Sequence, residues 1–270
     1  MGNRVKTYFV AGMALAASLT ACDDIKESDR YIEVPAAKVE RTVLLEDFTG
    51  QNCTNCPAAH RAIEALEEQY GEHLVAVSIH AGIFGISAEN KRYTGLMQPD
   101  GQSYNDRYGI SEYPKGVADG HTPIGFDDWA TAVYNDIQQP TPLSIGIAAL
   151  ADAGEVAMDI TLESSEELSG NLVVWIVESG IVARQEDKDL GRIPDYVHNN
   201  VFRACVNGLD GEGVTLAVGE PSTLSYSIPL KATATETWKP ENLAVVAFVK
   251  NGSGVVQAAR AAVSVSPSAE

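Results

Sequence analysis

Three segments in the first third of the chain differ in the spacing of their apolar side chains. Residues 42–48, Thr-Val-Leu-Leu-Glu-Asp-Phe, read as a buried strand with an apolar centre. After Pro57, apolar side chains recur at helical spacing until Gly71, a residue type that often ends helices. Residues 73–80 form a second apolar, β-branched run. This order predicts a strand, a helix and a second strand, with a site at the carboxyl end of the first strand of a parallel sheet.

The pattern of the remaining chain changes near residue 140. Residues 81–102 are polar and rich in Gly and Asn, which predicts a long loop, and a helix is expected over residues 126–139. Beyond Pro142, short apolar runs alternate with Gly, Asn, Asp and Ser, and residues 184–200 are expected to form a charged loop. We therefore predict an α/β domain over residues 39–140 and an all-β antiparallel sandwich, immunoglobulin-like, over residues 141–270. The expected sandwich strands are 143–150, 155–162, 171–178, 201–206, 223–230, 242–250 and 255–265.

The first 21 residues have the three parts of an export signal. Arg4 and Lys6 precede an apolar run over residues 8–19, which is short for a membrane span and is followed by small residues. Residues 19–22, Leu-Thr-Ala-Cys, resemble a bacterial lipobox, which implies cleavage before Cys22 and attachment of lipid to that cysteine. The alternative is an ordinary secreted protein in which Cys22 is incidental. Residues 22–38 are expected to form an acidic tether between the lipid and the fold.

Charge excludes one class of partner. Once the signal is removed, 17 Lys and Arg remain against 37 Asp and Glu, a net charge of -20. No basic stripe interrupts this acidic background, and phosphate-backbone binding depends on positive charge. We therefore expect no nucleic-acid partner, and a membrane reached through the lipid on Cys22.

Two of the four cysteines form a Cys53-Thr54-Asn55-Cys56 motif at the predicted start of the first helix. At this position the unpaired N–H groups and the helix dipole stabilise a thiolate. Cys53 is expected to be the exposed nucleophile and Cys56 the more buried cysteine that resolves a mixed disulfide. In an exported protein the same pair is also compatible with a structural disulfide.

Metal and cofactor sites are not expected at this motif. Cys53, Cys56 and His60 have ligand-like spacing, but no second Cys/His pair completes a four-ligand zinc site. Cys56 is followed by Pro57, which excludes the haem-attachment pattern Cys-x-x-Cys-His. We therefore predict no metal and no cofactor.

The residues around the dithiol resemble those of thioredoxin-like proteins. Asp47-Phe48 precedes Cys53 as in the pattern Asp-Phe-x-x-x-x-Cys-x-x-Cys, and residues 108–114 resemble Tyr-Gly-Ile-x-x-x-Pro. The resemblance implies that Asp47 is a buried proton-transfer acid and that Pro114 is a cis proline beside the dithiol. It also implies that Tyr113 and Pro114 border the groove that binds the substrate backbone. A water-exposed strand-end carboxylate is the alternative for Asp47.

Two departures from the thioredoxin pattern leave the activity open. Asn52 stands where thioredoxins have tryptophan, and Thr54-Asn55 replaces their Gly-Pro dipeptide. His60 lies one helical turn after Cys56, and we expect it to face solvent, the alternative being a role in stabilising a thiolate. Cys205 is expected to be a buried strand thiol, and His80 and His198 are expected to be structural.

The chain after residue 21 as a whole resembles the 28-kDa outer-membrane protein family of Bacteroidetes. The resemblance rests on segments 44–57, 196–201 and 243–249. It implies a lipoprotein of the outer membrane, facing the periplasm or exposed on the cell surface, in which a thioredoxin-like domain precedes a β-rich domain. It does not imply one particular reaction.

Two functions follow from these observations. In the first, the protein exchanges thiols and disulfides with envelope or surface proteins, and its protein partner is unknown. In the second, it is a surface binding or adhesion lipoprotein whose Cys53–Cys56 disulfide is structural and whose β-rich domain presents loops to a partner. Whether the protein is an enzyme depends on which of the two holds.

Overall fold

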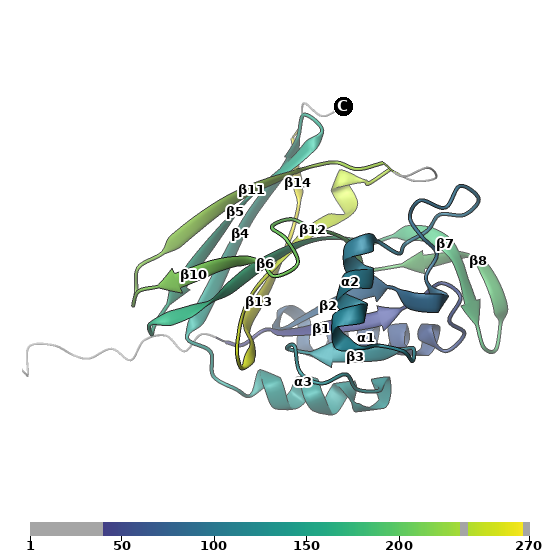
Figure 1. Ribbon diagram of the computed structural model, residues 1–270, viewed down its shortest axis with the longest axis horizontal. Helices are drawn as coiled ribbons and strands as arrows, with labels where there is room; N and C mark the ends of the chain where they lie inside the picture. The colour runs from purple at the N-terminus through teal and green to yellow at the C-terminus, as the bar shows by residue number, and fades with distance from the viewer. Residues whose placement is uncertain (1–39, 233–236, 267–270) are drawn as a thin grey trace, which may run out of the picture. The chain divides into compact units, whose positions relative to one another are not determined.

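The computed structural model describes residues 40–232 and 237–266, all within the unit Ala37–Glu270 (Figure 1). The predicted signal peptide, the tether and Cys22 lie outside the described residues. The described chain is rich in β-structure, with mixed sheets and a few helices. Its α-helices are α1 (Cys56–Tyr70), α2 (Pro99–Tyr108) and α3 (Trp129–Ile137), and its strands are β1 (Val43–Thr49), β2 (Leu74–His80), β3 (Lys115–Ala118), β4 (Leu143–Asp152), β5 (Glu155–Ser164), β6 (Leu168–Glu178), β7 (Ile181–Asp187), β8 (Gly191–His198), β9 (Val201–Cys205), β10 (Glu212–Leu216), β11 (Ser222–Pro229), β12 (Leu243–Asn251), β13 (Gly254–Ala262) and β14 (Ser264–Val265).

The largest sheet joins strands from both sides of residue 140. Its order is β13-β12-β6-β9-β2-β1-β3, and β10 pairs with β6 in addition. β1 runs parallel to β2 and antiparallel to β3. β9 meets β2 in parallel through Ser78 and Val201, and it pairs with β6 in antiparallel. The ranges 39–140 and 141–270 therefore share one sheet, and residue 140 separates two kinds of local structure.

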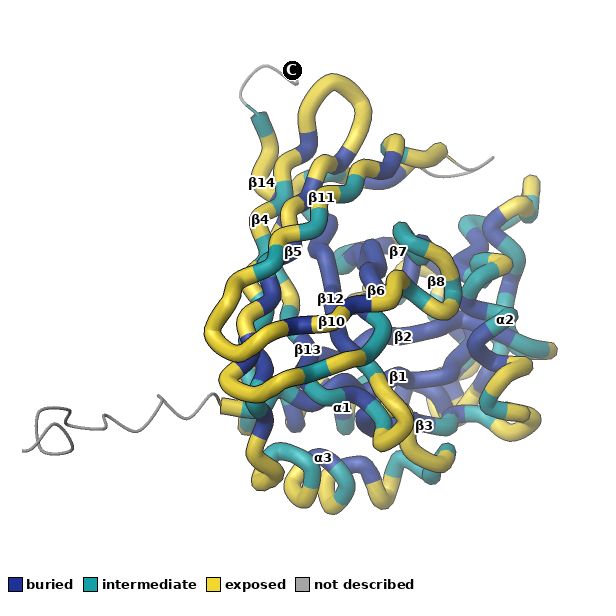
Figure 2. The backbone as a smooth tube through the Cα atoms, turned by 60° about the vertical axis from the view of Figure 1, so that its left-hand side comes forward, coloured by how far each residue is buried: buried dark blue, intermediate teal, exposed yellow. Residues whose placement is uncertain are grey.

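β1 and β2 lie in the interior of this unit. All seven residues of each strand are buried, as expected for parallel strands that are covered on both faces (Figure 2). One face of β1 packs against α1 and α3 in a core that includes Leu45, Ile63 and Trp129. The opposite face belongs to a second core, which includes Phe48 and Trp175. Any polar side chain on β1 is therefore held away from water.

A four-stranded sheet, in the order β11-β5-β4-β14, accounts for much of the β-rich second half. β5 alternates buried and exposed residues along its length, so that one face of this sheet is buried. The buried side chains of β5, including Ile160, share a third core with those of β6 and β12, including Val174 and Val245. The two large sheets are therefore held together by apolar packing.

Most of the expected strands and helices are present, with end points that differ by a few residues. Two expectations are wrong. Part of the stretch assigned to a loop begins α2, whose polar sequence buries Tyr104 and Asn105 and gives little apolar periodicity. The charged loop expected over residues 184–200 is a hairpin, β7–β8, closed by a turn in which Asp187 accepts backbone hydrogen bonds from residues 189 and 190.

Within residues 40–232 and 237–266, none of the helices combines the length and the apolar character that crossing a bilayer requires.

Candidate functional site

The candidate site lies where β1 ends and α1 begins. Cys53 and Cys56 form a disulfide, with the two sulfur atoms 2.14 Å apart. The turn before it is closed by a hydrogen bond from the Cys53 amide to the Gly50 carbonyl, and Asn55 occupies the position that caps α1. Pro57 follows in the first turn of the helix, where a missing N–H has no cost. The sequence motif is therefore confirmed as a disulfide at a helix amino terminus.

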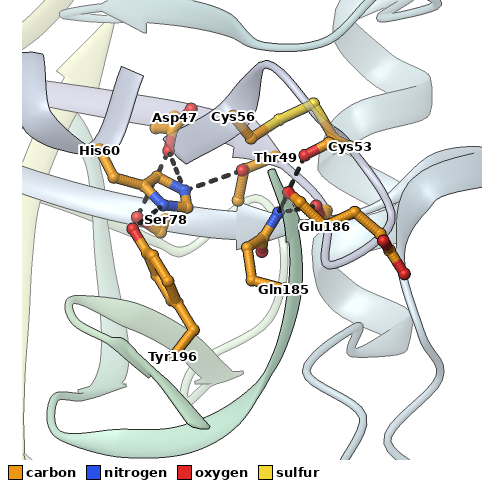
Figure 3. The surroundings of a disulfide bond; sticks show 10 residues. Asp47, Thr49, Cys53, Cys56, His60, Ser78, Gln185, Glu186 and Tyr196 are labelled. Carbon is orange, nitrogen blue, oxygen red and sulfur yellow. Dashed lines mark hydrogen bonds and ion pairs between the residues drawn. A yellow bond between two sulfur atoms is a disulfide. The ribbon is translucent and has the colours of Figure 1, made fainter. Parts of the chain in front are cut away.

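Cys53 is not the exposed residue that the sequence predicts. Its exposed fraction is 3%, and that of Cys56 is 0%. The β7–β8 hairpin covers it: the side-chain amide of Gln185 donates hydrogen bonds to the carbonyls of Gly50, at 3.2 Å, and Cys53, at 2.9 Å (Figure 3). The Lys188 amide donates to the Thr54 carbonyl at 2.9 Å. The dithiol is thus buried by residues more than 130 positions away.

Asn52, the residue that replaces the tryptophan of thioredoxins, takes part in the same cover. Its side-chain oxygen accepts a hydrogen bond of 2.8 Å from the guanidinium of Arg184 in β7. Its backbone amide donates to the carbonyl of Phe84, at 2.9 Å, in the turn after β2. A polar side chain at position 52 therefore fastens the dithiol loop to the hairpin.

The Tyr113–Pro114 peptide bond is cis, as the family resemblance implies. Lys115, the next residue, pairs with Phe48, so the cis bond lies at the end of β1 that carries the dithiol. The Tyr113 hydroxyl donates to the Asn105 side chain, and its ring packs edge-on against Phe84 with ring centroids 5.7 Å apart. The role of Tyr113 and Pro114 in binding a substrate stays a prediction.

Asp47 is fully buried, on the face of β1 that packs against α1. Its exposed fraction is 0%, and its Oδ1 atom accepts no hydrogen bond from the part of the chain that is described. The Ser78 hydroxyl donates to Oδ2 over a long 3.4 Å. Burial raises the pKa of Asp47 to about 8, so the side chain is a neutral carboxylic acid at pH 7.

His60 faces this acid and not the solvent, which corrects the sequence-based expectation. Its Nε2 atom lies 3.0 Å from the Thr49 hydroxyl and 3.7 Å from Oδ2 of Asp47. Its Nδ1 atom lies 2.9 Å from the hydroxyl of Tyr196 in β8 (Figure 3). Burial, together with the nearby His198 and Arg61, lowers the pKa of His60 to about 3. His60 and Asp47 are therefore both uncharged at neutral pH and do not form an ion pair.

Two more buried histidines, His80 and His198, lie next to His60. The ring centroids of His80 and His198 are 5.2 Å apart, and those of His60 and His198 are 6.4 Å apart. Burial lowers the pKa of His198 to about 4 and that of His80 well below its usual value. The three rings border a cavity of about 40 Å³, which also meets Ser78 and Tyr196. Among the residues whose structure is described, no His, Cys, Asp or Glu group is arranged to hold a metal.

Cys205 lies in β9, apart from the dithiol. Its side chain is half-buried, whereas the sequence predicts a buried thiol. The thiol donates a hydrogen bond to the carbonyl of Gly208. Burial raises the pKa of the thiol, which disfavours a reactive thiolate. Sequence reasoning missed the contacts of Gln185 and Tyr196 with the site, because they join segments distant in sequence; for Tyr196 the one available signal is its place in segment 196–201, on which the family resemblance partly rests.

Replacing Gln185 with Ala is expected to make the disulfide easier to reach. The substitution removes two hydrogen bonds that hold the hairpin over Cys53, each worth about 1 kcal/mol net, so reduction by dithiothreitol should be up to about thirtyfold faster. Alkylation of the released thiols, followed by mass spectrometry, measures this rate. Gln139→Ala, at an exposed position, is the matched control, and equal rates in all three proteins would show that the hairpin does not limit access.

Replacing Asp47 with Asn is expected to change how stability depends on pH. The folded pKa of Asp47, about 8, exceeds its ordinary value of 3.8, so between these pH values the folded state retains a proton that the unfolded state has lost. Stability from this group therefore falls as pH rises through that window. The gain in free energy of unfolding caused by Asp47→Asn should be larger at pH 8 than at pH 5, by on the order of a few kcal/mol.

Urea unfolding at both pH values tests this expectation. Asp195→Asn, at an exposed position in β8, is the matched control and should show no such difference. A gain that is the same at pH 5 and pH 8 would mean that Asp47 is ionised in the folded protein.

Comparisons with known proteins agree with the β-rich fold. Residues 101–267 match the family model for outer membrane protein Omp28. No curated protein matches the chain.

Among solved structures, HBP35 of Porphyromonas gingivalis resembles this chain in fold. It is 15% identical, with a TM-score of 0.63, over 87% of this chain and 79% of that one. A protein from Agrobacterium tumefaciens is 17% identical with a TM-score of 0.49, over 83% and 95% of the two chains. A domain of the outer membrane lipoprotein Omp28 from Porphyromonas gingivalis is 16% identical with a TM-score of 0.32, over 46% and 90%.

The family model spans more than half of the chain, and the chain therefore belongs to the Omp28 outer membrane protein family.

Proposed function

We propose that this protein is a thiol-disulfide exchange protein of the outer membrane, with a thioredoxin-like site formed by Cys53 and Cys56. The observation that carries the proposal is Asp47, a fully buried acid on the strand that leads to the dithiol. In the proposed reaction, Cys53 attacks a disulfide of an envelope or surface protein. The ionised form of Asp47, which a pKa of about 8 makes available near neutral pH, then takes the proton of the Cys56 thiol, and the Cys56 thiolate resolves the mixed disulfide.

A disulfide that serves as a cross-link gains nothing from such an acid. Placing an unpaired carboxyl group in an apolar core costs free energy, and the protein bears this cost at Asp47 without an ion pair in return. A pKa of about 8 makes the group able to take up and release a proton near neutral pH. A role in proton transfer therefore explains why the protein retains a buried carboxyl group at Asp47.

Local geometry supports the thioredoxin-like assignment for residues 39–140. β1, α1 and β2 form the parallel unit, β3 lies antiparallel beside β1, and the cis proline precedes β3. We assign an immunoglobulin-like sandwich to residues 141–270 on the pairing of β4, β5 and β11 and their packing against β6 and β12. On this assignment the hairpin that covers the dithiol belongs to the β-rich part.

The second candidate function is binding or adhesion at the cell surface, with a structural disulfide. The burial of Cys53 and its cover by the hairpin favour this candidate, because a nucleophile must be reached by its substrate. Exchange with a protein requires Gln185 to move away from the Gly50 and Cys53 carbonyls first. The two candidates therefore differ in whether the hairpin opens.

We further propose that lipid on Cys22 anchors the protein to the outer membrane, with the dithiol facing the periplasm or the cell exterior. Replacing Cys22 with Ala is expected to move the protein from the membrane fraction to the soluble fraction, because the acyl chains supply the membrane affinity. The melting temperature of the folded part should not change. Continued membrane association of the variant would contradict the anchor.

The exchange function is tested by the reduction potential of the Cys53–Cys56 pair and by turnover of insulin or a scrambled disulfide protein. We expect a potential within about -270 to -120 mV, and activity that Cys53→Ser abolishes and Cys205→Ser retains. A potential below about -300 mV without turnover would assign the disulfide a structural role and would favour the binding function.

A further inference from the structure

The proposed exchange leaves a proton inside the protein. When Asp47 takes the proton of the Cys56 thiol, the proton resides on a group with an exposed fraction of 0%. The residues paired with Asp47 across the sheet are Ser78 and Gly116, which have no charge to assist release. Repeated exchange requires a path from this acid to water.

His60 is placed to provide such a path. One ring nitrogen, Nε2, faces Asp47 and Thr49, and the other, Nδ1, contacts the hydroxyl of Tyr196 at 2.9 Å (Figure 3). Tyr196 is partly exposed on β8, so it links the buried ring to the surface. The chain of groups therefore runs from the acid through one imidazole and one phenol towards solvent.

The surroundings of His60 keep the ring neutral, which suits transfer of a proton from one nitrogen to the other. A neutral imidazole accepts a proton at one nitrogen while it donates from the second. The adjacent cavity of about 40 Å³ is lined by Ser78, Tyr196 and the other two histidines. A space of this size, with several polar groups in its lining, is large enough for a water molecule to continue the path beside the ring.

We propose that His60 and Tyr196 are positioning residues that carry the proton of Asp47 to and from solvent, a role that rests on the proposed exchange function. In the oxidising direction, Asp47 first donates its proton to Nε2 while Nδ1 donates to the Tyr196 hydroxyl, which releases a proton to water. The Asp47 carboxylate then takes the Cys56 proton, the Cys56 thiolate bonds to Cys53 Sγ, and the substrate leaves as a thiolate with the electron pair of the broken S–S bond.

The reverse half-reaction restores the starting tautomer. When the disulfide is reduced, Cys56 takes a proton from Asp47, Asp47 takes one from Nε2, and Nδ1 regains one from Tyr196. The 3.7 Å between Nε2 and Oδ2 must shorten by about 1 Å for direct transfer, as catalytic hydrogen bonds commonly do once substrate is bound.

Several titratable or charged groups face this path from the packed elements, and their ionisation contributes to any pH profile. They are Asp47 from β1, Arg61, Glu64 and Glu67 from α1, His80 from β2, and Asp187, Tyr196 and His198 from the hairpin. The experiment therefore compares variants at each pH and does not interpret the wild-type profile alone.

The relay is tested by mixing reduced full-length protein, carrying Cys205→Ser, with a symmetrical aryl disulfide that releases one coloured thiolate per step. The first phase reports attack by Cys53, and the second reports resolution by Cys56. We expect His60→Ala to slow the second phase at least about tenfold and to leave the first within about twofold. Tyr196→Phe should slow the second phase in the same direction. Millimolar imidazole should restore this phase in His60→Ala, because it fills the space left by the ring.

Matched controls are His121→Ala and Tyr134→Phe, which alter exposed residues away from the site and should leave both phases unchanged. Thermal unfolding of each variant verifies that it is folded. Equal slowing of both phases, no slowing in either variant, or no restoration by imidazole would overturn the relay. If wild-type protein gives no exchange in either phase, the proposed function itself fails, which is a different outcome from an active wild type with unaffected variants.

Discussion

The structure depends on the complete burial of β1. A strand covered on both faces must fill every position with side chains that tolerate an apolar environment, yet β1 contains Glu46 and Asp47 in succession. Burial raises the pKa of Glu46 to about 7 and that of Asp47 to about 8. The two acids lie on opposite faces and have different partners: Glu46 accepts a hydrogen bond from Tyr108, whereas Asp47 faces His60 of α1. The raised pKa values of Glu46 and Asp47 thus result from the burial of β1 on both faces.

The hairpin β7–β8 connects the β-rich half to the dithiol in two places. Gln185 contacts the turn that carries Cys53, and Tyr196 contacts His60. Both residues belong to the same two-stranded ribbon, so a movement of the ribbon changes access to the sulfur atoms and the surroundings of the buried acid together. The β-rich half therefore supplies side chains that contact the candidate site directly.

The sequence predicts the part of this site that is local. The preceding strand, the dithiol and the helix after it follow one another within residues 43–70, and they can be predicted from spacing and apolar periodicity. The cis bond at Pro114 came from a family resemblance, because a proline by itself indicates little about its isomer. The contacts of Gln185 and Tyr196 with the site cannot be predicted from periodicity, since they span more than 130 positions. The same limit applies to His60: helical spacing indicates its side of the helix but not what packs against that side.

The pairing of β9 with β2 makes the first half of the chain dependent on residues 141–270. β9 meets β2 at Ser78 and Val201, and Asn200 accepts the backbone hydrogen bond of Ser78. Without residues 141–270, β2 would become an edge strand with unpaired backbone groups and an apolar face open to water, a common origin of aggregation. Loss of the β-rich half by truncation would therefore be selected against even in a protein that used the dithiol alone. The two halves are expected to be inherited together.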